Sequence, residues 1–440
     1  MTLRTTARFL TLALVAVCTC LPAPARGQAL TLRQVLERVV AHNPQLAEAR
    51  LGVEASEQSV QSAWGKHLPR LSTDASITRR EDPTPYIPAT SPTTPAHFSD
   101  EYASWSGLLT LPLYQGGQIS ANVDLARVRR DIQALALAQT RNELLANTVN
   151  AYNKLLQLEQ LRVAIRASTA ALEEQVRNAR TLLAVERIAR VDLLKVEVQL
   201  ANEQQRLLVL DEGIATAAAM LSYFMGDNPS AGTPALALAD SLSLPDSSAV
   251  PVAGDARDWA QRPEYRAASF GVREAQLSQR SALGKLLPSL SGFGGYTQQF
   301  GFRPTYDAGN WFVGLQVSLP LFDRSLYADL AREHVLQRKA KERLRSVDNQ
   351  LGLELTNSLT SIRESAHRVT TAQQVIEQAH ESFRIEQLKY GSGAGAVSDL
   401  LLAQAAASAA EANLSQALFD YNAALVAYHK ATGTMEEYLK

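Results

Sequence analysis

The chain has 440 residues, a formal net charge of -1 and 20% charged residues. This balance excludes the basic footprint of a nucleic-acid-binding protein, and the modest Gly and Pro content excludes a disordered chain. Both cysteines, Cys18 and Cys20, lie near the N-terminus, so the rest of the chain has no residue for disulfide or thiolate chemistry.

Residues 1–27 have the pattern of a secretory signal peptide. Arg4 and Arg8 precede an apolar run over 9–21, and small residues follow at two possible cleavage sites, 25–27 and 27–29. The run is too short to span a bilayer comfortably. The residues before Cys18 and Cys20 lack the Leu and the small residue of a lipoprotein site. We therefore expect export and, between acylated and non-acylated forms, favour the non-acylated one.

The rest of the sequence is an internal duplication. Residues 43–46 (NPQL) reappear as 262–265 (RPEY), and residues 66–71 (KHLPRL) reappear as 285–290 (KLLPSL). Residues 111–114 (LPLY) are echoed by 319–322 (LPLF). Such self-similarity indicates tandem structural repeats. We expect repeats over 28–225 and 255–434, a connector over 226–254 and a tail over 435–440.

The first repeat begins with helix and continues with strands. Thr31 and Gln34 have the spacing of a capping box, and Asn43-Pro44 suits a helix restart, so a helical segment is predicted over 31–66. Alternating apolar residues predict strands over 71–79 and 105–114. Five prolines predict a loop over 82–95 between them. Gly116-Gly117 then turns the chain into helix.

Very long helices follow the strands. Residues 118–182 contain no Pro or Gly, which predicts about 95 Å of helix. Residues 191–224 carry apolar residues at alternating steps of three and four, the seam of a supercoiled helix. The second repeat has strands over 290–300 and 311–321 around a loop at 301–309, then helices over 325–390 and 396–432. No later segment approaches 18 uninterrupted apolar residues, so we expect no transmembrane helix and any membrane span to be made of strands.

These elements predict a membrane β-barrel continued by a helical tube. The strand pairs carry at their ends aromatic residues suited to membrane interfaces, namely Trp105, Tyr114, Trp311 and Phe322. Four strands cannot close, and open edges are not tolerated in lipid. Two copies would give eight strands and a filled interior. Three copies give a conducting 12-stranded barrel, and their long hairpins would form a 12-helix tube in an aqueous space.

In this order and in duplicate, the motifs resemble the outer-membrane efflux protein family, the TolC-like channels. The resemblance covers residues 30–434 and implies a homotrimer in Gram-negative outer-membrane lipid with a periplasmic α-barrel. It implies the exit duct of a tripartite efflux or type I secretion system, with a periplasmic adaptor (membrane fusion protein) and an inner-membrane transporter. The cargo is left open among drugs, metals and proteins. The alternative is a periplasmic coiled-coil adaptor or scaffold without a pore, which predicts β-rich domains flanking one hairpin.

No enzyme, cofactor or metal site is expected. The seven histidines are scattered without zinc-site spacing, and the four methionines give no support for a soft-metal path. The Gly391, Gly393 and Gly395 cluster follows a helix and lacks the lysine of a phosphate loop.

The candidate functional residues lie at the two hairpin tips. By position in the repeat, Asp192 and Asp399 match the acids that ring the periplasmic entrance in this family, where six carboxylates would favour cations. A helix dipole alone also favours an Asp in a first turn.

The tips also depart from the family pattern. Leu402 replaces a second acid, and the first tip carries Arg187 and Arg190 without a glycine. The candidate residues of the constriction are therefore Asp192, Asp399, Leu402 and Arg190, and the sequence leaves open an acidic or a partly hydrophobic closure. The resemblance places the adaptor contact at 183–192 and 391–399, including Arg187, Gly391, Gly393 and Gly395.

Overall fold

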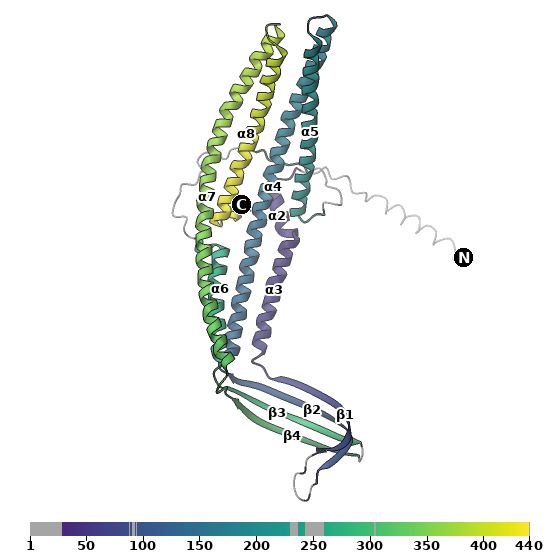
Figure 1. Cartoon of the computed structure of the whole chain (residues 1–440), viewed down its shortest axis with the longest axis vertical. Coiled ribbons are helices and arrows are strands. Elements are labelled where there is room, and N and C mark those ends of the chain that lie inside the picture. The colour runs from purple at the N-terminus through teal and green to yellow at the C-terminus, as the bar shows by residue number, and fades with distance from the viewer. Residues whose placement is uncertain are drawn as a thin grey trace, which may run out of the picture.

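The molecule has a β-sheet at one end and long helices running away from it (Figure 1). The computed structural model describes residues 29–87, 89, 93, 95–228, 236–242, 259–302 and 305–439. The predicted signal peptide with Cys18 and Cys20, and much of the predicted connector, lie outside the described residues.

The start of the first repeat follows the predicted capping chemistry. α2 (Leu32–His42) begins with the Thr31–Gln34 capping box, and α3 (Pro44–Gly65) has Asn43 as its cap. The Asn43 side chain accepts a hydrogen bond from Gln45 N at 2.8 Å and donates one to Phe224 O at 2.9 Å. Asn43 therefore ties the start of α3 to the end of α5 (Arg190–Phe224).

Arg262 makes the equivalent connection in the second repeat. It precedes α6 (Pro263–Gly284) and donates to Ala431 O at 3.2 Å, near the end of α8 (Val397–Thr432). The 3% exposed Arg262 side chain also forms ion pairs with Glu264 and Glu354 at 3.2 and 3.1 Å. In each repeat, the helix that precedes the strand pair (α3 or α6) is thus tied at its start to the end of the last helix of the same repeat (α5 or α8).

We expect Arg262→Ala to lower the free energy of unfolding by about 2 kcal/mol, because charged hydrogen bonds to one buried group are lost together. Guanidinium unfolding of the detergent-solubilised protein measures this change. Arg266→Ala, at an exposed arginine in the same helix, is the control and should stay within about 0.5 kcal/mol. Equal effects of the two substitutions would contradict the role of Arg262.

The sheet has four antiparallel strands in the order β1-β2-β3-β4: β1 (Arg70–Ile87), β2 (His97–Gln115), β3 (Ser289–Phe302) and β4 (Thr305–Ser318). Directly paired residues share a face, so the register defines two faces. One face is apolar and includes the exposed side chains Leu71, Leu109, Val313, Leu315 and Val317. The other face carries Ser72, Asp74, Ser104, Ser106, Thr110 and Gln316.

The structure corrects five strand boundaries. One of them is the start of β2, which begins at His97 instead of at residue 105. The predicted loop over 82–95 was too long, because β1 continues to Ile87 with register shifts beside its prolines. Proline is tolerated there because β1 is an edge strand. The loop predicted over 301–309 shrinks, since β3 reaches Phe302 and β4 begins at Thr305. The strand predicted to run to 321 ends at Ser318, just before Pro320, which cannot donate to a ladder.

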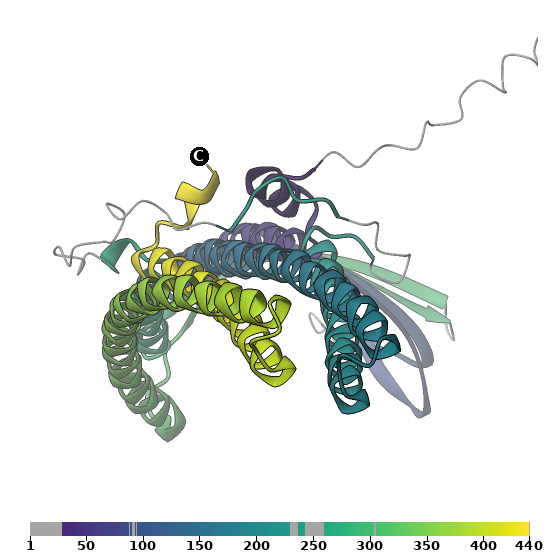
Figure 2. The same cartoon turned by 90° about the horizontal axis from the view of Figure 1, so that it is seen from above.

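The long helices form the wall above the sheet. α4 (Gln118–Ala184) and α7 (Arg324–Gly391) run nearly its full length, as predicted. Near the sheet the contacts give the order α3-α4-α6-α7, and toward the tips they give α5-α4-α8-α7. Seen from above, the helices form a curved row (Figure 2). One free edge of the molecule therefore consists of β1, α3 and α5, and the other consists of β4 and α7.

Two glycines form the junction between sheet and helices. Gly116, between β2 and α4, has φ +60, and a Cβ added to it would lie 2.2 Å from Gly284 O. A Cβ on Gly284 would in turn lie 2.7 Å from Gly116 O. The backbones of the two repeats thus touch where α6 ends and α4 begins, and neither position has space for a side chain.

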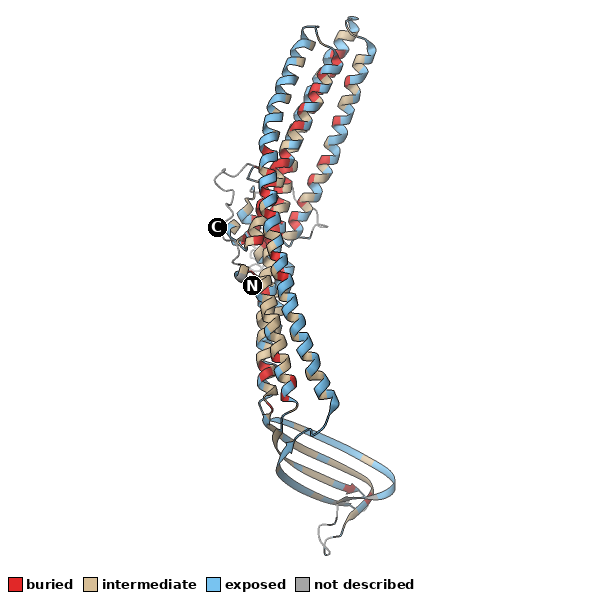
Figure 3. Cartoon of the chain, turned by 60° about the vertical axis from the view of Figure 1, so that its left-hand side comes forward, coloured by how far each residue is buried: buried red, intermediate tan, exposed pale blue. Residues whose placement is uncertain are grey.

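Burial concentrates along the helix contacts and near the middle of the wall (Figure 3). In the sheet, the outer strands β1 and β4 are mostly exposed and the inner strands β2 and β3 are mostly half-buried. At mid-height Tyr152 Oη donates to Asp240 Oδ2 at 2.7 Å, with Leu30 O also at 2.9 Å. Leu30 pairs as an isolated bridge with Leu238. The start of the described chain and the connector are therefore bound to α4 at this level.

α5 differs from the expectation that no helix is apolar enough to cross a membrane. Within the described part of the chain it passes that test by length and composition alone. It packs along α4, and Asp211 and Glu212 lie within it. Its outer side exposes Val198, Leu208, Val209 and Met220. Because α5 forms a free edge of the wall, this surface suits another protein surface better than lipid.

Candidate functional site at the hairpin tips

The first tip turns without glycine, as predicted. Glu186 takes the left-handed conformation, with φ 57, that glycine usually supplies. The turn is closed by backbone hydrogen bonds from Glu186 N to Leu183 O and from Arg187 N to Leu182 O, at 3.0 and 2.9 Å. Arg187 is exposed on this turn, and Arg190 begins α5.

The second tip depends on two of its three glycines. Gly393 has φ +79, and a Cβ on Gly395 would lie 3.0 Å from Lys389 Cβ. Ala394 N and Gly395 N both donate to Lys389 O, at 2.9 and 3.1 Å. A Cβ on Gly391 would meet nothing within 4 Å, so local packing does not explain that glycine.

The structure places Asp192 and Asp399 in the first turns of α5 and α8. Their local charges differ. Asp192 forms an ion pair with Lys195 at 3.1 Å, whereas the Asp399 contact in the described structure is Ser398 Oγ at 3.5 Å. The negative charge of Asp192 is therefore partly offset by a lysine, whereas the contact of Asp399 is with a neutral hydroxyl that does not offset its charge.

Tyr390 joins the two tips and was missed from the sequence. It packs against a buried cluster formed by Leu172, Val176, Val196 and Val397, which come from both hairpins. Burial raises the pKa of the Tyr390 phenol, and the negative charge of Asp192 raises it further. An aromatic residue directly before the Gly391–Gly395 turn was the signal available in the sequence.

An apolar groove lies beside the acids. Its volume is about 540 Å³, and it is lined from α5 by Val191, Leu194 and Val198 and from α8 by Leu401 and Leu402, among others. Leu402 is 73% exposed. The tip region therefore combines carboxylates with exposed aliphatic side chains. This combination is compatible with an acidic closure and with a partly hydrophobic one, the two possibilities left open by the sequence.

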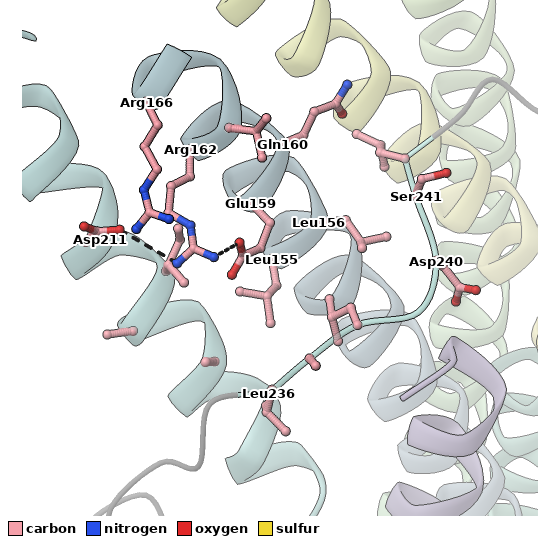
Figure 4. A pocket seen from close by; sticks show the side chains of 17 residues that line it. Leu155, Leu156, Glu159, Gln160, Arg162, Arg166, Asp211, Leu236, Asp240 and Ser241 are labelled. Atoms are coloured by element: carbon pink, nitrogen blue, oxygen red, sulfur yellow. Dashed lines mark hydrogen bonds and ion pairs between the residues drawn. The ribbon is translucent and has the colours of Figure 1, made fainter. Parts of the chain in front are cut away.

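A larger hollow lies at mid-height between α4, α5 and residues 236–242 (Figure 4). Its volume is about 1010 Å³. Arg162 and Arg166 point into it together, beside Asp211. Arg162 already pairs with Glu159 and lies 3.9 Å from Asp211, so its charge is offset within the hollow.

The predicted interface aromatics lie on or beside the sheet. Trp105 and Trp311 lie in the middle of β2 and β4 and not at strand ends as predicted, because both strands begin earlier than expected. Tyr114 lies near the helix end of β2, and Phe322 lies beyond the end of β4. All four are exposed. Tyr296 on β3, missed in the sequence, lies between the two tryptophan positions, with its ring centroid 6.1 Å from that of Trp105. Among the described residues no group of three His, Cys, Asp or Glu side chains could hold a metal ion.

Comparisons with known proteins give a consistent result. A family model described as outer membrane efflux protein matches residues 35–227 and 259–434. Outer membrane efflux protein BepC of Brucella suis biovar 1 (strain 1330) is 24% identical over 416 residues, 92% of this chain and 86% of that protein. Cobalt-zinc-cadmium resistance protein CzcC of Cupriavidus metallidurans is 23% identical over 382 residues, 85% of this chain and 83% of that protein.

Solved structures share the fold. The outer-membrane channel OprN is 19% identical with a TM-score of 0.79, covering 92% of this chain and 90% of that chain. The Campylobacter jejuni CmeC outer membrane channel is 15% identical with a TM-score of 0.80, covering 92% of this chain and 85% of that chain. The four-stranded sheet with doubled long hairpins, as predicted for one chain, is therefore the fold of known channels.

Proposed function

Since this chain belongs to the outer membrane efflux protein family, we propose that three copies form the exit duct of a tripartite efflux system. Membership makes the protein an outer-membrane efflux channel with a helical extension into the periplasm. The proposal adds the number of copies, a periplasmic adaptor and an inner-membrane transporter.

The proposal rests on the two free edges of the molecule, each of which runs from an edge strand into edge helices. β4 and α7 form one edge, while β1, α3 and α5 form the other. These edges are different, so copies would meet head to tail and close as a ring. Three copies bring twelve strands together and pair every edge strand, which lipid requires.

Exposed apolar residues support the same closure. On α5 the free surface includes Leu208 and Val209, and on α7 it includes Leu353, Ile385 and Leu388. Exposed large aliphatic side chains on the two edge helices suit a contact between protein surfaces. The neighbouring α7 is the surface that a ring would bring against α5.

We expect Leu208→Lys to prevent trimer formation, because three lysines would be buried in apolar contacts. Light scattering after gel filtration in detergent measures the mass of the complex. Val163→Lys is the matched control, because Val163 is 70% exposed against 69% for Leu208 but lies on α4 at the mid-height hollow. A monomeric wild type, or a trimeric Leu208→Lys variant, would contradict the proposed closure.

The proposed conduction is tested in planar bilayers. Purified wild-type trimers should give single-channel currents, whereas a scaffold without a pore should give none. The scaffold alternative also predicts one hairpin between β-rich domains, while this chain has two hairpins that each follow a strand pair. We favour efflux over type I secretion because the relatives include an efflux protein and a metal-resistance protein.

We place the adaptor at the tips and the entrance closure beside them. Arg187, Gly391, Gly393 and Gly395 lie on the outermost turns, where a periplasmic partner can reach them. The closure combines Asp192 and Asp399 with Leu402 and the apolar groove. Trp105, Tyr114, Trp311 and Phe322 would anchor the barrel at the lipid interfaces.

A further inference from the structure

The polar face of the sheet carries a small apolar cluster that includes two phenylalanines. In the closed ring this face lines the water-filled interior, and it consists mainly of Ser, Thr, Gln and Gly. The register places Phe293 on this face, because it pairs with Thr110 on one side and Gly314 on the other. It also places Phe312 there, in the row of Gly295, Leu108 and Ser72.

Two glycines leave the space that the two rings occupy. Each phenylalanine lies over the glycine paired with it on the adjacent strand. A Cβ on Gly314 would lie 2.6 Å from the Phe293 ring, and a Cβ on Gly295 would lie 2.8 Å from the Phe312 ring. The ring centroids are 6.1 Å apart with planes inclined at 52°, and in the single chain Phe312 is 38% exposed. The pair therefore presents a fixed aromatic surface to water.

We propose that Phe293 and Phe312 form an aromatic contact site inside the barrel for cargo that carries a planar aromatic ring. The inference rests on the proposed trimer, in which three such pairs would face the same lumen. Ring edges and faces attract other aromatic rings beyond simple burial of area. Saturated cargo of equal size and charge lacks this term, so the site distinguishes the two.

Two matched cations test the site in planar bilayers. Benzyltrimethylammonium and (cyclohexylmethyl)trimethylammonium share charge and approximate size, but only the first has an aromatic ring. Each is added on the barrel side during potassium current measurements. We expect the aromatic cation to halve the wild-type current at a concentration about five-fold lower than the saturated cation, the ratio that one ring–ring contact supplies.

The double variant Phe293→Leu/Phe312→Leu should lose this ratio while keeping its conductance in potassium chloride. Leucine keeps apolar bulk above Gly295 and Gly314, and the single variants, with one ring left, should give intermediate ratios. Phe300→Leu is the matched control, because Phe300 lies on the same strand but on the opposite, lipid-facing side. It should keep the wild-type ratio.

Equal potency of the two cations on the wild type, or an unchanged ratio in both the single and the double variants, would overturn the aromatic site while the proposed channel stands. Absence of any wild-type current would instead overturn the proposed function and, with it, this inference.

Discussion

Gly116→Ala should abolish assembly in the outer membrane. A Cβ at this position would overlap Gly284 O at 2.2 Å, and alanine would also have to adopt φ +60. Left-handed strain and the overlap together cost about 4 kcal/mol, a large share of the stability of a domain. Native gels of outer-membrane fractions should show loss of the assembled band.

Gly117→Ala is the matched control at the next residue. Gly117 has φ +76, but a Cβ there would meet nothing within 4 Å. Only the backbone strain remains, about 1 kcal/mol, so assembly should persist. Equal assembly of both alanine variants would show that the contact with Gly284 has no energetic role.

Asp399→Asn should lower cation selectivity more than Asp192→Asn does. In a trimer three Asp399 carboxylates would act on one passing ion, and each stabilises a cation by about 0.5 kcal/mol at about 8 Å in water, so together they change the potassium permeability roughly ten-fold. The Asp192 charge is already offset by Lys195 at 3.1 Å. Reversal potentials in a salt gradient give the potassium-to-chloride permeability ratio.

A second comparison separates charge from shape. Leu402→Ala widens the apolar part of the closure without changing charge, so it should raise conductance and leave the permeability ratio unchanged. Should Asp399→Asn leave both conductance and selectivity at wild-type values, Asp399 does not line the constriction and the closure is apolar.

Much of the fold was accessible from the sequence because its signals are local. The Thr31–Gln34 capping box, the Asn43-Pro44 restart and the glycine-free run after Gln118 each fix a helix boundary through chemistry within a few residues. The duplication predicted the second repeat from the first.

The misplaced boundaries depend on context that a single sequence does not contain. Pro83 and Pro85 were assigned to a loop, yet they lie in β1, at the irregular part of its pairing with β2. Leu319 and Leu321 continue the alternation beyond Ser318, where β4 ends. Alternating apolar and polar residues indicate which side of the chain faces lipid, but a strand also requires a hydrogen-bonded neighbour.

The candidate site was predicted in part. The turn chemistry of Gly393 and the position of Asp399 follow from the sequence near them. The Asp192–Lys195 pair is a contact one helical turn apart, but its effect on the charge balance was not anticipated. Tyr390 was missed because it packs against residues of a hairpin that is distant in sequence. The periodicity within one helix does not show which distant residues contact it.

The unlike free edges have a genetic consequence. A ring of head-to-tail copies uses both edges of every member, so one subunit with a damaged β4–α7 edge leaves a gap that its intact neighbours cannot fill. A variant allele of this kind, expressed beside the normal gene, would inactivate most mixed complexes. Its effect in cells should therefore be dominant, while an allele that removes the protein altogether should be recessive.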